Sequence, residues 1–291
     1  MGDRGKAMSY VPDLGAASQP AAGGRWRPAP AIRLSAVFHL GSLAAVALDP
    51  PSWPYIGAAL AANHAALGLA GMLPRSTTLG PNLNRLPQAA ASRGEIALTF
   101  DDGPDPSATL PILDMLDRYQ AKASFFCIGR QAAMYPDVVR EIARRGHGIE
   151  NHSNRHSKAF AGYGIRRLQC DIEAAQEVLA ALAGRPPAFF RAPMGLRNPL
   201  LDPVLARLGL TYVSWTRRGL DTVDRNRESV IARLVRELAG GDVLLLHDRV
   251  ATGPHCDRAM ALSVLPALMD RIAAAGLRPV TLRSACRSAA A

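Results

Sequence analysis

Aromatic residues are scarce in this chain of 291 residues, because Phe, Trp and Tyr together make up only 5% of it. The chain also lacks any pair of cysteines at the close spacing of a zinc or redox motif. The four cysteines are scattered, at Cys127, Cys170, Cys256 and Cys286. They indicate reduced thiols, with one disulfide as the alternative if the domain that carries them is periplasmic.

Acidic residues are in the minority, since 24 Asp and Glu face 34 Lys and Arg and give a net charge of +10. A basic surface favours anionic headgroups of a membrane or phosphorylated substrates. Nucleic acid is the competing partner of a basic chain. The low aromatic content and the absence of a recognised binding motif among the basic residues argue against it. We therefore expect no nucleic-acid partner.

The N-terminal third contains two uncharged runs, residues 34–48 and 55–73, separated by a proline-rich break. A bilayer core takes roughly 20 apolar helical residues, so we expect a helical hairpin over 31–75 that anchors the chain in a membrane. Two soluble helices packed on the rest of the chain are the alternative. A signal peptide is disfavoured, because the first run begins late and no small-residue cleavage site clearly follows it.

Arginines flank this hairpin on its outer sides, and none lies in its turn. They are Arg25, Arg27 and Arg33 before it and Arg75, Arg85 and Arg93 after it. The positive-inside rule then places both flanks in the cytoplasm. We expect the inner (cytoplasmic) membrane as the location, with the domain that follows on the cytoplasmic side. Residues 1–30, rich in Gly, Ala and Pro, predict a disordered tail, and 76–94 a linker.

Two adjacent carboxylates follow an apolar run. Residues 96–100 predict a buried strand that Gly103-Pro104 ends, so the strand delivers Asp101 and Asp102 at its C-terminal end. Neighbouring side chains of a strand point in opposite directions, so the two aspartates need not do the same job.

Two histidines, His152 and His156, are four residues apart. This spacing places them on one face of a helical turn, where both imidazoles can reach one cation. With one aspartate they give three protein ligands, and a metal site with three ligands keeps a position open for water or substrate, as catalytic zinc sites do. Either motif alone is more often a turn or a surface pair, but the two in this order indicate a catalytic metal site, with the second aspartate as a candidate base.

Over residues 95–286 the chain resembles the polysaccharide deacetylase family, which is carbohydrate esterase family 4 with its NodB-homology domain. Five motifs of that family recur in order, at residues 99–103, 152–156, 191–195, 221–225 and 244–247. The resemblance implies that Asp102, His152 and His156 hold a divalent metal, zinc or cobalt. It also implies that Asp101 is the general base.

The remaining motifs supply further roles by the same resemblance. Arg191 would orient the general base, and His247 would be the general acid that protonates the departing amine. Asp224 would hold the imidazolium form of His247 and raise its pKa. The backbone N–H of Met194 would help to bind the oxyanion.

Two residues depart from the family pattern. Met194 stands where an aromatic residue is usual, and Arg225 where a tryptophan is usual. A flexible thioether and a cation suit a phosphate or carboxylate better than the face of a neutral sugar. We hypothesise a substrate that carries an anionic group near the reactive amide. The alternative is that Arg225 points to solvent.

Strand and helix patterns alternate along the rest of the chain. Strands are predicted at 96–100, 123–128, 148–151, 189–191, 210–215, 243–247 and 279–282. Helices are predicted at 109–119, 135–145, 165–183, 199–208, 227–239 and 263–275. This alternation predicts an α/β fold with a parallel sheet closed or nearly closed into a barrel, and the active residues fall at strand C-terminal ends. The resemblance implies a distorted (β/α)7 barrel.

Three functions remain open. The first is a metal-dependent hydrolase that removes an N-acyl group, such as acetyl, from an amino sugar of a polysaccharide or glycoconjugate. The second is a deformylase or deacetylase of a lipid-linked (polyprenyl-phosphate) amino sugar. The third is an inactive homologue that only binds sugar. The presence of a base and an acid beside the metal motif argues against the third.

Overall fold

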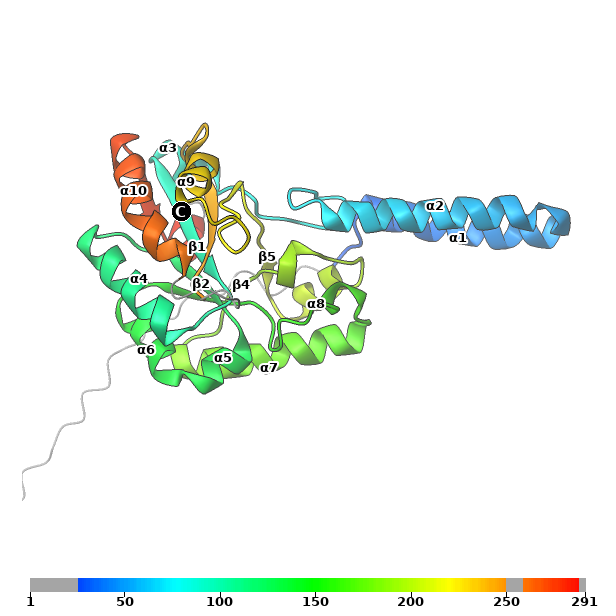
Figure 1. Ribbon diagram of the computed structural model, residues 1–291. Coiled ribbons are helices and arrows are strands. Elements are labelled where there is room, and N and C mark those ends of the chain that lie inside the picture. The colour runs from blue at the N-terminus through cyan, green and yellow to red at the C-terminus, as the bar shows by residue number, and fades with distance from the viewer. Residues whose placement is uncertain (1–25, 250–258, 288–291) are drawn as a thin grey trace, which may run out of the picture.

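The structure is a computed structural model that describes residues 26–249 and 259–287. Its centre is a parallel sheet with strand order β5-β4-β3-β2-β1-β7-β6, and β8 pairs with β1 (Figure 1). The strands are β1 Glu95–Asp101, β2 Ser124–Cys127, β3 Gly148–Asn151, β4 Phe189–Phe190, β5 Thr211–Tyr212, β6 Arg217–Arg218, β7 Val243–His247 and β8 Arg278–Val280. The curved parallel sheet confirms the predicted (β/α) barrel fold.

Helices cover the outer face of the sheet and connect its strands (Figure 1). They are α3 Gln88–Ser92, α4 Pro106–Arg118, α5 Gly129–Met134, α6 Pro136–Arg144, α7 Ile165–Ala183, α8 Leu201–Arg207, α9 Arg227–Val235, α10 Met260–Ala274 and α11 Leu282–Arg287. Each long helix buries one apolar face, such as Ile112, Leu113 and Leu116 of α4. These faces and the outward side chains of β1, β2 and β7 form the main core.

Strand β1 is the centre of this core, and all seven of its residues are buried. It pairs with β2 on one side and β7 on the other, and Asp101 lies opposite both Phe126 and His247. Because all these strands are parallel, their C-terminal ends meet at one edge of the barrel. The register therefore brings the last residues of β1 and β7 together.

The segment predicted as a linker packs against the barrel. Leu79, Leu86 and Ala90 are buried. The backbone of Leu83 donates to Tyr212 O at 3.0 Å and accepts from Ser214 N at 3.1 Å. Leu86 N donates to Gly241 O at 2.8 Å. The segment thus bridges from the outer edge of β5 to the start of β7.

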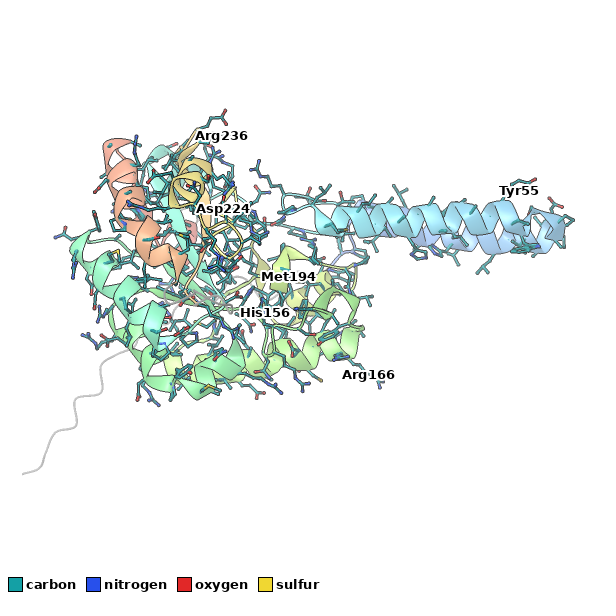
Figure 2. The ribbon with its side chains drawn as sticks, in the orientation of Figure 1. Tyr55, His156, Arg166, Met194, Asp224 and Arg236 are labelled. Atoms are coloured by element: carbon teal, nitrogen blue, oxygen red, sulfur yellow. The ribbon has the colours of Figure 1, made fainter. Side chains whose placement is uncertain are left out.

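The N-terminal helices α1 Pro30–Leu48 and α2 Trp53–Met72 form an antiparallel hairpin that projects from the barrel (Figure 1). A short 3-10 helix, η1 Pro50–Ser52, makes the turn. Figure 2 shows Tyr55 near the far end of the hairpin, away from His156 and Met194. Polar pairs join the two helices: Asn63 Nδ2 donates to Ser35 Oγ at 2.8 Å.

Among the described residues, only helix α1 is long and apolar enough to cross a membrane. Its mean hydropathy is 1.7, and 11% of the 18-residue stretch that could span the bilayer is buried. Its large side chains, such as Leu34, Leu40 and Leu43, are exposed. The barrel therefore does not cover this apolar surface. The predicted tail over residues 1–30 falls largely outside the described residues, as does Cys256.

Candidate active site

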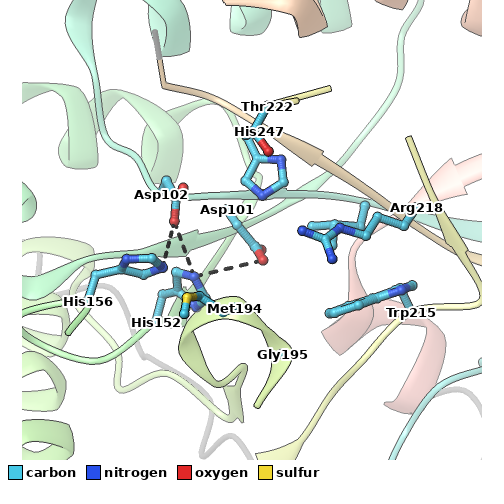
Figure 3. A pocket seen from close by; sticks show the side chains of 11 residues that line it. Asp101, Asp102, His152, His156, Met194, Gly195, Trp215, Arg218, Thr222 and His247 are labelled. Carbon is cyan, nitrogen blue, oxygen red and sulfur yellow. Dashed lines mark ion pairs between the residues drawn. The ribbon is translucent and has the colours of Figure 1, made fainter. Parts of the chain in front are cut away.

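Asp101 and Asp102 lie together at the end of β1 (Figure 3), where Asp101 pairs with Arg191 and Asp102 lies closest to His156. Asp101 is the last residue of the strand, whereas Asp102 has a φ of 78°, in the left-handed region. The change in backbone conformation turns Asp102 toward two histidines, while Asp101 turns toward Arg191.

A buried carboxylate supports this turn. A Cβ on Gly103 would lie 2.1 Å from Asp248 Oδ2, so only glycine fits beside Asp248. Asp248 accepts the Gly103 N–H at 3.0 Å and the Thr109 hydroxyl at 2.6 Å. Burial raises the pKa of Asp248 to about 7. Asp248 thus holds the turn that orients Asp102, a role that sequence reasoning missed.

Asp102, His152 and His156 converge, with one ligand atom of each within 4.8 Å of the others. Asp102 Oδ1 lies 3.3 Å from His152 Nε2 and 3.1 Å from His156 Nε2. The prediction that a helical turn aligns the histidines is wrong, because they lie in a loop where Ser153 and His156 have φ of 65° and 49°. There Ser153 Oγ accepts the His156 N–H at 3.0 Å and Asn151 Oδ1 accepts the Ser153 N–H at 2.9 Å, which replaces helical hydrogen bonds.

The donors in this cluster fit a divalent cation. His152 Nδ1 lies 2.8 Å from the carbonyl oxygen of Arg191, and a carbonyl can only accept, so Nδ1 carries the proton. The lone pair of the neutral ring is then on Nε2, which faces Asp102. Asp102 Oδ1 is buried and has no hydrogen-bond partner within the described residues. An orphaned carboxylate oxygen beside two imidazole nitrogens is a ligand set that suits Zn²⁺ or Co²⁺.

The charges in the cluster depend on one another. Burial alone would raise the pKa of Asp102, but His152, His156 and His247 hold it well below its ordinary value. Burial and the neighbouring His152 lower the pKa of His156. Burial would lower the pKa of His152 as well, but Asp101 and Asp102 raise it. Asp102 is therefore ionised at neutral pH.

Arg191 is fully buried, and its contacts account for its position. Its guanidinium donates to Asp101 Oδ1 at 2.7 Å, to Thr99 Oγ1 at 2.9 Å and to Ser214 O at 2.9 Å. It also stacks over the ring of Phe126, with Cζ 4.1 Å from the ring centroid. A buried cation needs a paired anion, so Arg191 and Asp101 hold each other in place.

His247 is supported by Asp221, and not by Asp224 as the sequence analysis expected. Asp221 Oδ1 lies 2.8 Å from His247 Nδ1, and Asp221 Oδ2 accepts the His247 N–H at 2.8 Å. Asp224 instead pairs with Arg233 at 2.6 Å and accepts the Asn226 N–H. The reason is that the chain turns away after Asp221 toward α9, which carries the second aspartate of the motif to the surface.

Burial would lower the pKa of His247, but the hydrogen bond to Asp221 and the nearby Asp101 and Asp102 raise it to about 9. The imidazole is therefore protonated at neutral pH. With Nδ1 bound to Asp221, the proton on Nε2 is available to a neighbouring group.

These residues line one pocket of about 160 Å³. Its lining residues are Asp101, Asp102, His152, His156, Met194, Gly195, Trp215, Arg218, Thr222, Leu245 and His247. Figure 3 shows the histidines of the cluster on one side and Arg218 with Trp215 on the other. The pocket therefore holds a candidate metal site, a carboxylate and a protonated imidazole.

The two residues that depart from the family pattern lie in different places. Met194 lines the pocket with a φ of 57° and is 43% exposed. Arg225 is exposed and does not line the pocket. Sequence reasoning missed Trp215 and Arg218, which do line it. Trp215 ends a predicted strand, where the other site residues were found, and this signal could have identified it.

Comparison with known proteins agrees with this arrangement. The model of a family described as polysaccharide deacetylase matches residues 88–213. A peptidoglycan-N-acetylglucosamine deacetylase of Bacillus cereus is 32% identical over 194 residues, which cover 66% of this chain and 88% of that protein. A chitooligosaccharide deacetylase of Azorhizobium caulinodans is 33% identical over 167 residues, which cover 57% of this chain and 79% of that protein.

A solved structure shows the same fold. The crystal structure of the Bc1960 peptidoglycan N-acetylglucosamine deacetylase aligns with a TM-score of 0.64 at 29% identity, and covers 71% of this chain and 92% of that one. Fold and pocket together define a hydrolase built on a (β/α) barrel. The chain belongs to the polysaccharide deacetylase family.

Proposed function

We propose that this protein is a metal-dependent hydrolase that removes the acetyl group from an N-acetylated amino sugar of a polysaccharide or glycoconjugate. The observation that carries the proposal is the pocket itself. A carboxylate held by Arg191 and an imidazolium held by Asp221 flank the Asp102, His152 and His156 cluster. Amide hydrolysis needs a base for water, an electrophilic partner for the carbonyl and an acid for the amine.

Asp102, His152 and His156 would hold the divalent cation, Zn²⁺ or Co²⁺. Such a cation supplies Lewis acidity, which polarises the amide carbonyl and acidifies water. Among the described residues three side chains converge, so these ligands would leave coordination positions open for water or substrate.

Asp101 would act as the general base. Its Oδ1 is occupied by Arg191 at 2.7 Å, whereas its Oδ2 faces His152 Nε2 at 3.9 Å. The proton from the attacking water would therefore go to Oδ2, the oxygen on the side of the cluster.

His247 would act as the general acid. With a pKa of about 9 it is protonated at neutral pH, and Asp221 leaves its Nε2 proton to the departing amine. The backbone N–H of Met194, at the rim of the pocket, would stabilise the oxyanion of the tetrahedral intermediate.

The test is hydrolysis by purified protein. With N-acetylglucosamine oligomers, acetate release should stop after chelation and return when Zn²⁺ or Co²⁺ is added. Asp101→Asn should keep the metal content and lose about 10²- to 10⁴-fold in kcat. His156→Ala should lower the metal content itself. Acetate release that persists in metal-free protein contradicts the mechanism.

The hairpin favours a second candidate substrate, a lipid-linked amino sugar that carries an acetyl or formyl group. Helix α1 exposes an apolar surface, and a hollow of about 690 Å³ at the hairpin base is lined by residues 73–78 together with Trp215. Trp215 also lines the active-site pocket. A substrate anchored in a membrane could therefore reach the site along this side.

The same surface supports a location at the inner membrane. Helix α1 alone among the described helices is long and apolar enough to cross a membrane, and we propose that α2 inserts with it because the two pack as an antiparallel pair. In this proposal the barrel faces the cytoplasm. The arginines on both flanks favour this orientation.

A further inference from the structure

The pocket contains one arginine with no anionic partner. Arg217 pairs with Asp242 at 3.0 Å, but its neighbour Arg218 forms no ion pair within the described residues. The Nε of Arg218 is buried and has no hydrogen-bond partner there. A guanidinium carries five N–H donors, and a buried donor without an acceptor costs free energy. An unpaired arginine beside a catalytic pocket indicates a missing acceptor.

Arg218 is held in position by its surroundings. Its backbone belongs to β6, where it lies opposite Leu245 of β7. Its guanidinium lies over Trp215, with Cζ 5.3 Å from the ring centroid. Trp215 is 6% exposed and packs directly against Gly195. A Cβ at Gly195 would lie 2.3 Å from Trp215 Cη2, so a larger residue there would displace the ring. The cation is therefore oriented before any ligand arrives, which reduces the entropy lost on binding.

The charges of the other pocket residues are balanced. Asp101 is paired with Arg191, and His247 is paired with Asp221. Asp102 faces the two histidines of the metal cluster. Among these charged groups of the described residues, Arg218 is the cation without an anionic partner. It lies across the pocket from His156 (Figure 3).

We propose that Arg218 binds an anionic substituent, a carboxylate or phosphate, on the amino sugar that is deacetylated. The inference rests on the proposed function and names the class of its substrate. The planar guanidinium matches both anions with two parallel hydrogen bonds. The pocket thus selects charged N-acetyl sugars over neutral ones, and Arg218 takes the part that the sequence analysis gave to Arg225.

The first experiment compares kcat/KM for three substrates. They are a neutral N-acetylglucosamine oligomer, an oligomer whose N-acetylated sugar bears an O-lactyl carboxylate, and N-acetylglucosamine 1-phosphate. We expect one anionic substrate to exceed the neutral one by about tenfold or more, from a charge-assisted hydrogen bond. The preferred anion distinguishes a carboxylate source from a phosphate source.

The second step is Arg218→Gln, which keeps hydrogen-bonding capacity and removes the charge. We expect it to abolish the preference for the anionic substrate, mainly through KM. Arg227→Gln, at an exposed arginine that begins α9, is the matched control and should keep the preference. An anionic-to-neutral ratio that is near one in the unsubstituted protein, or unchanged in Arg218→Gln, overturns the proposal.

Equilibrium binding separates this proposal from the proposed function. In Asp101→Asn protein, the same sugars are titrated with and without Arg218→Gln. Tighter binding of the anionic sugar that requires Arg218 supports the subsite, even if the unsubstituted protein hydrolyses none of the sugars and the proposed function fails. Equal binding of neutral and anionic sugars overturns the subsite, even if hydrolysis is observed.

Discussion

Asp221 holds the pocket residue His247 through two hydrogen bonds. One carboxylate accepts both the backbone N–H and the Nδ1 proton of His247, at 2.8 Å each. The two contacts fix the ring plane and stabilise the imidazolium, so a single residue sets both the geometry and the pKa of the acid.

Asp221→Asn should therefore lower the pKa of His247. The pKa is raised to about 9 in the protein, so the acid form is present below that pH and is lost as the pH rises through it. In the variant the basic limb of the kcat/KM profile should move toward the ordinary histidine value of about 6.5. The measurement is the pH dependence of acetate release between pH 5 and about 10.

Asp224→Asn is the comparison for this prediction. Asp224 pairs with Arg233 at the surface, so the variant should leave the basic limb in place. If Asp224→Asn moves the limb and Asp221→Asn does not, the assignment of Asp221 is wrong.

At the scale of single residues, the sequence predicts which side chains carry the chemistry better than it predicts which side chains contact each other. The motifs name Asp101, Asp102, His152, His156 and Arg191, and the structure brings these five together. Aspartates three residues apart in one motif look equivalent in a sequence. Only the path of the chain decides which of them reaches His247.

At the scale of elements, buried polar groups join helices to strands. His147 lies between α6 and β3, where its Nδ1 accepts the Ala123 N–H at 3.2 Å and its ring meets Phe125 edge-on at 5.7 Å. It is completely buried. Burial, with a smaller effect of Lys122, lowers its pKa to about 4.

This depressed pKa predicts acid sensitivity. In the unfolded chain His147 takes up a proton as the pH falls below about 6.5, whereas in the folded protein it takes up that proton only near pH 4. The free energy of unfolding should therefore fall by about 2 kcal/mol between pH 7 and 5 from this residue alone. His147→Asn, which keeps an acceptor, should flatten that part of the profile in urea unfolding. Parallel profiles for the two proteins would contradict the prediction.

The base of the hairpin is a second junction between elements. Arg197 N donates to Gly71 O at 3.1 Å, and a Cβ on Gly71 would lie 2.0 Å from Arg197 O. Trp26 Nε1 donates to Asp202 at 2.7 Å beside it. The C-terminal end of α2 is therefore hydrogen-bonded to, and in close contact with, the loop that follows Met194.

Gly71→Ala should displace this junction, because backbone lies where the methyl group would go. Gly68→Ala is the control on the same helix, since nothing lies within 4 Å of its Cβ position. We expect Gly71→Ala to increase proteolysis of residues 73–78 and Gly68→Ala to leave it unchanged or reduced, as alanine favours the helix by about 1 kcal/mol. Equal cleavage of both variants would show that the junction does not depend on Gly71.

The predicted ends of a helix or strand agree with the structure where its apolar pattern extends over many residues. Helix α7 spans the predicted residues, Ile165–Ala183, because its apolar face repeats over five turns and Gly184 ends it with a φ of 70°. Strand β6 was missed because Arg217-Arg218 has no apolar alternation. It exists only because β7 offers it hydrogen-bonding partners.

At the scale of the whole molecule, the proposed membrane location depends on the hairpin and on the arginines that flank it. The arginines after it have other contacts: Arg85 pairs with Asp242 at 2.9 Å and Arg93 with Glu95 at 2.7 Å. Arg75 donates to Thr216 O. These three arginines bind the barrel, whereas Arg27 and Arg33 are exposed, so the proposed orientation depends mainly on Arg27 and Arg33.

We expect a reporter that is active only in the periplasm to stay silent when fused after Ala291. A fusion in the turn, after Ser52, should be active, because the hairpin places that turn on the opposite side. Activity of both fusions would mean that only α1 crosses the membrane and that the barrel is periplasmic. Release of the protein from membranes by salt alone would show that neither helix inserts.

The sequence by itself determined the fold class, the order of the elements and the residue types that can bind a cation and move protons. These follow from local apolar periodicity and from the intrinsic chemistry of side chains. The tertiary structure alone decided that Asp221 holds His247, that Arg218 rather than Arg225 lines the pocket, and that residues 79–90 pack against the barrel. These contacts depend on which segments distant in the chain become neighbours. The free energy of that packing is a property of the whole fold, so no short stretch of sequence predicts it.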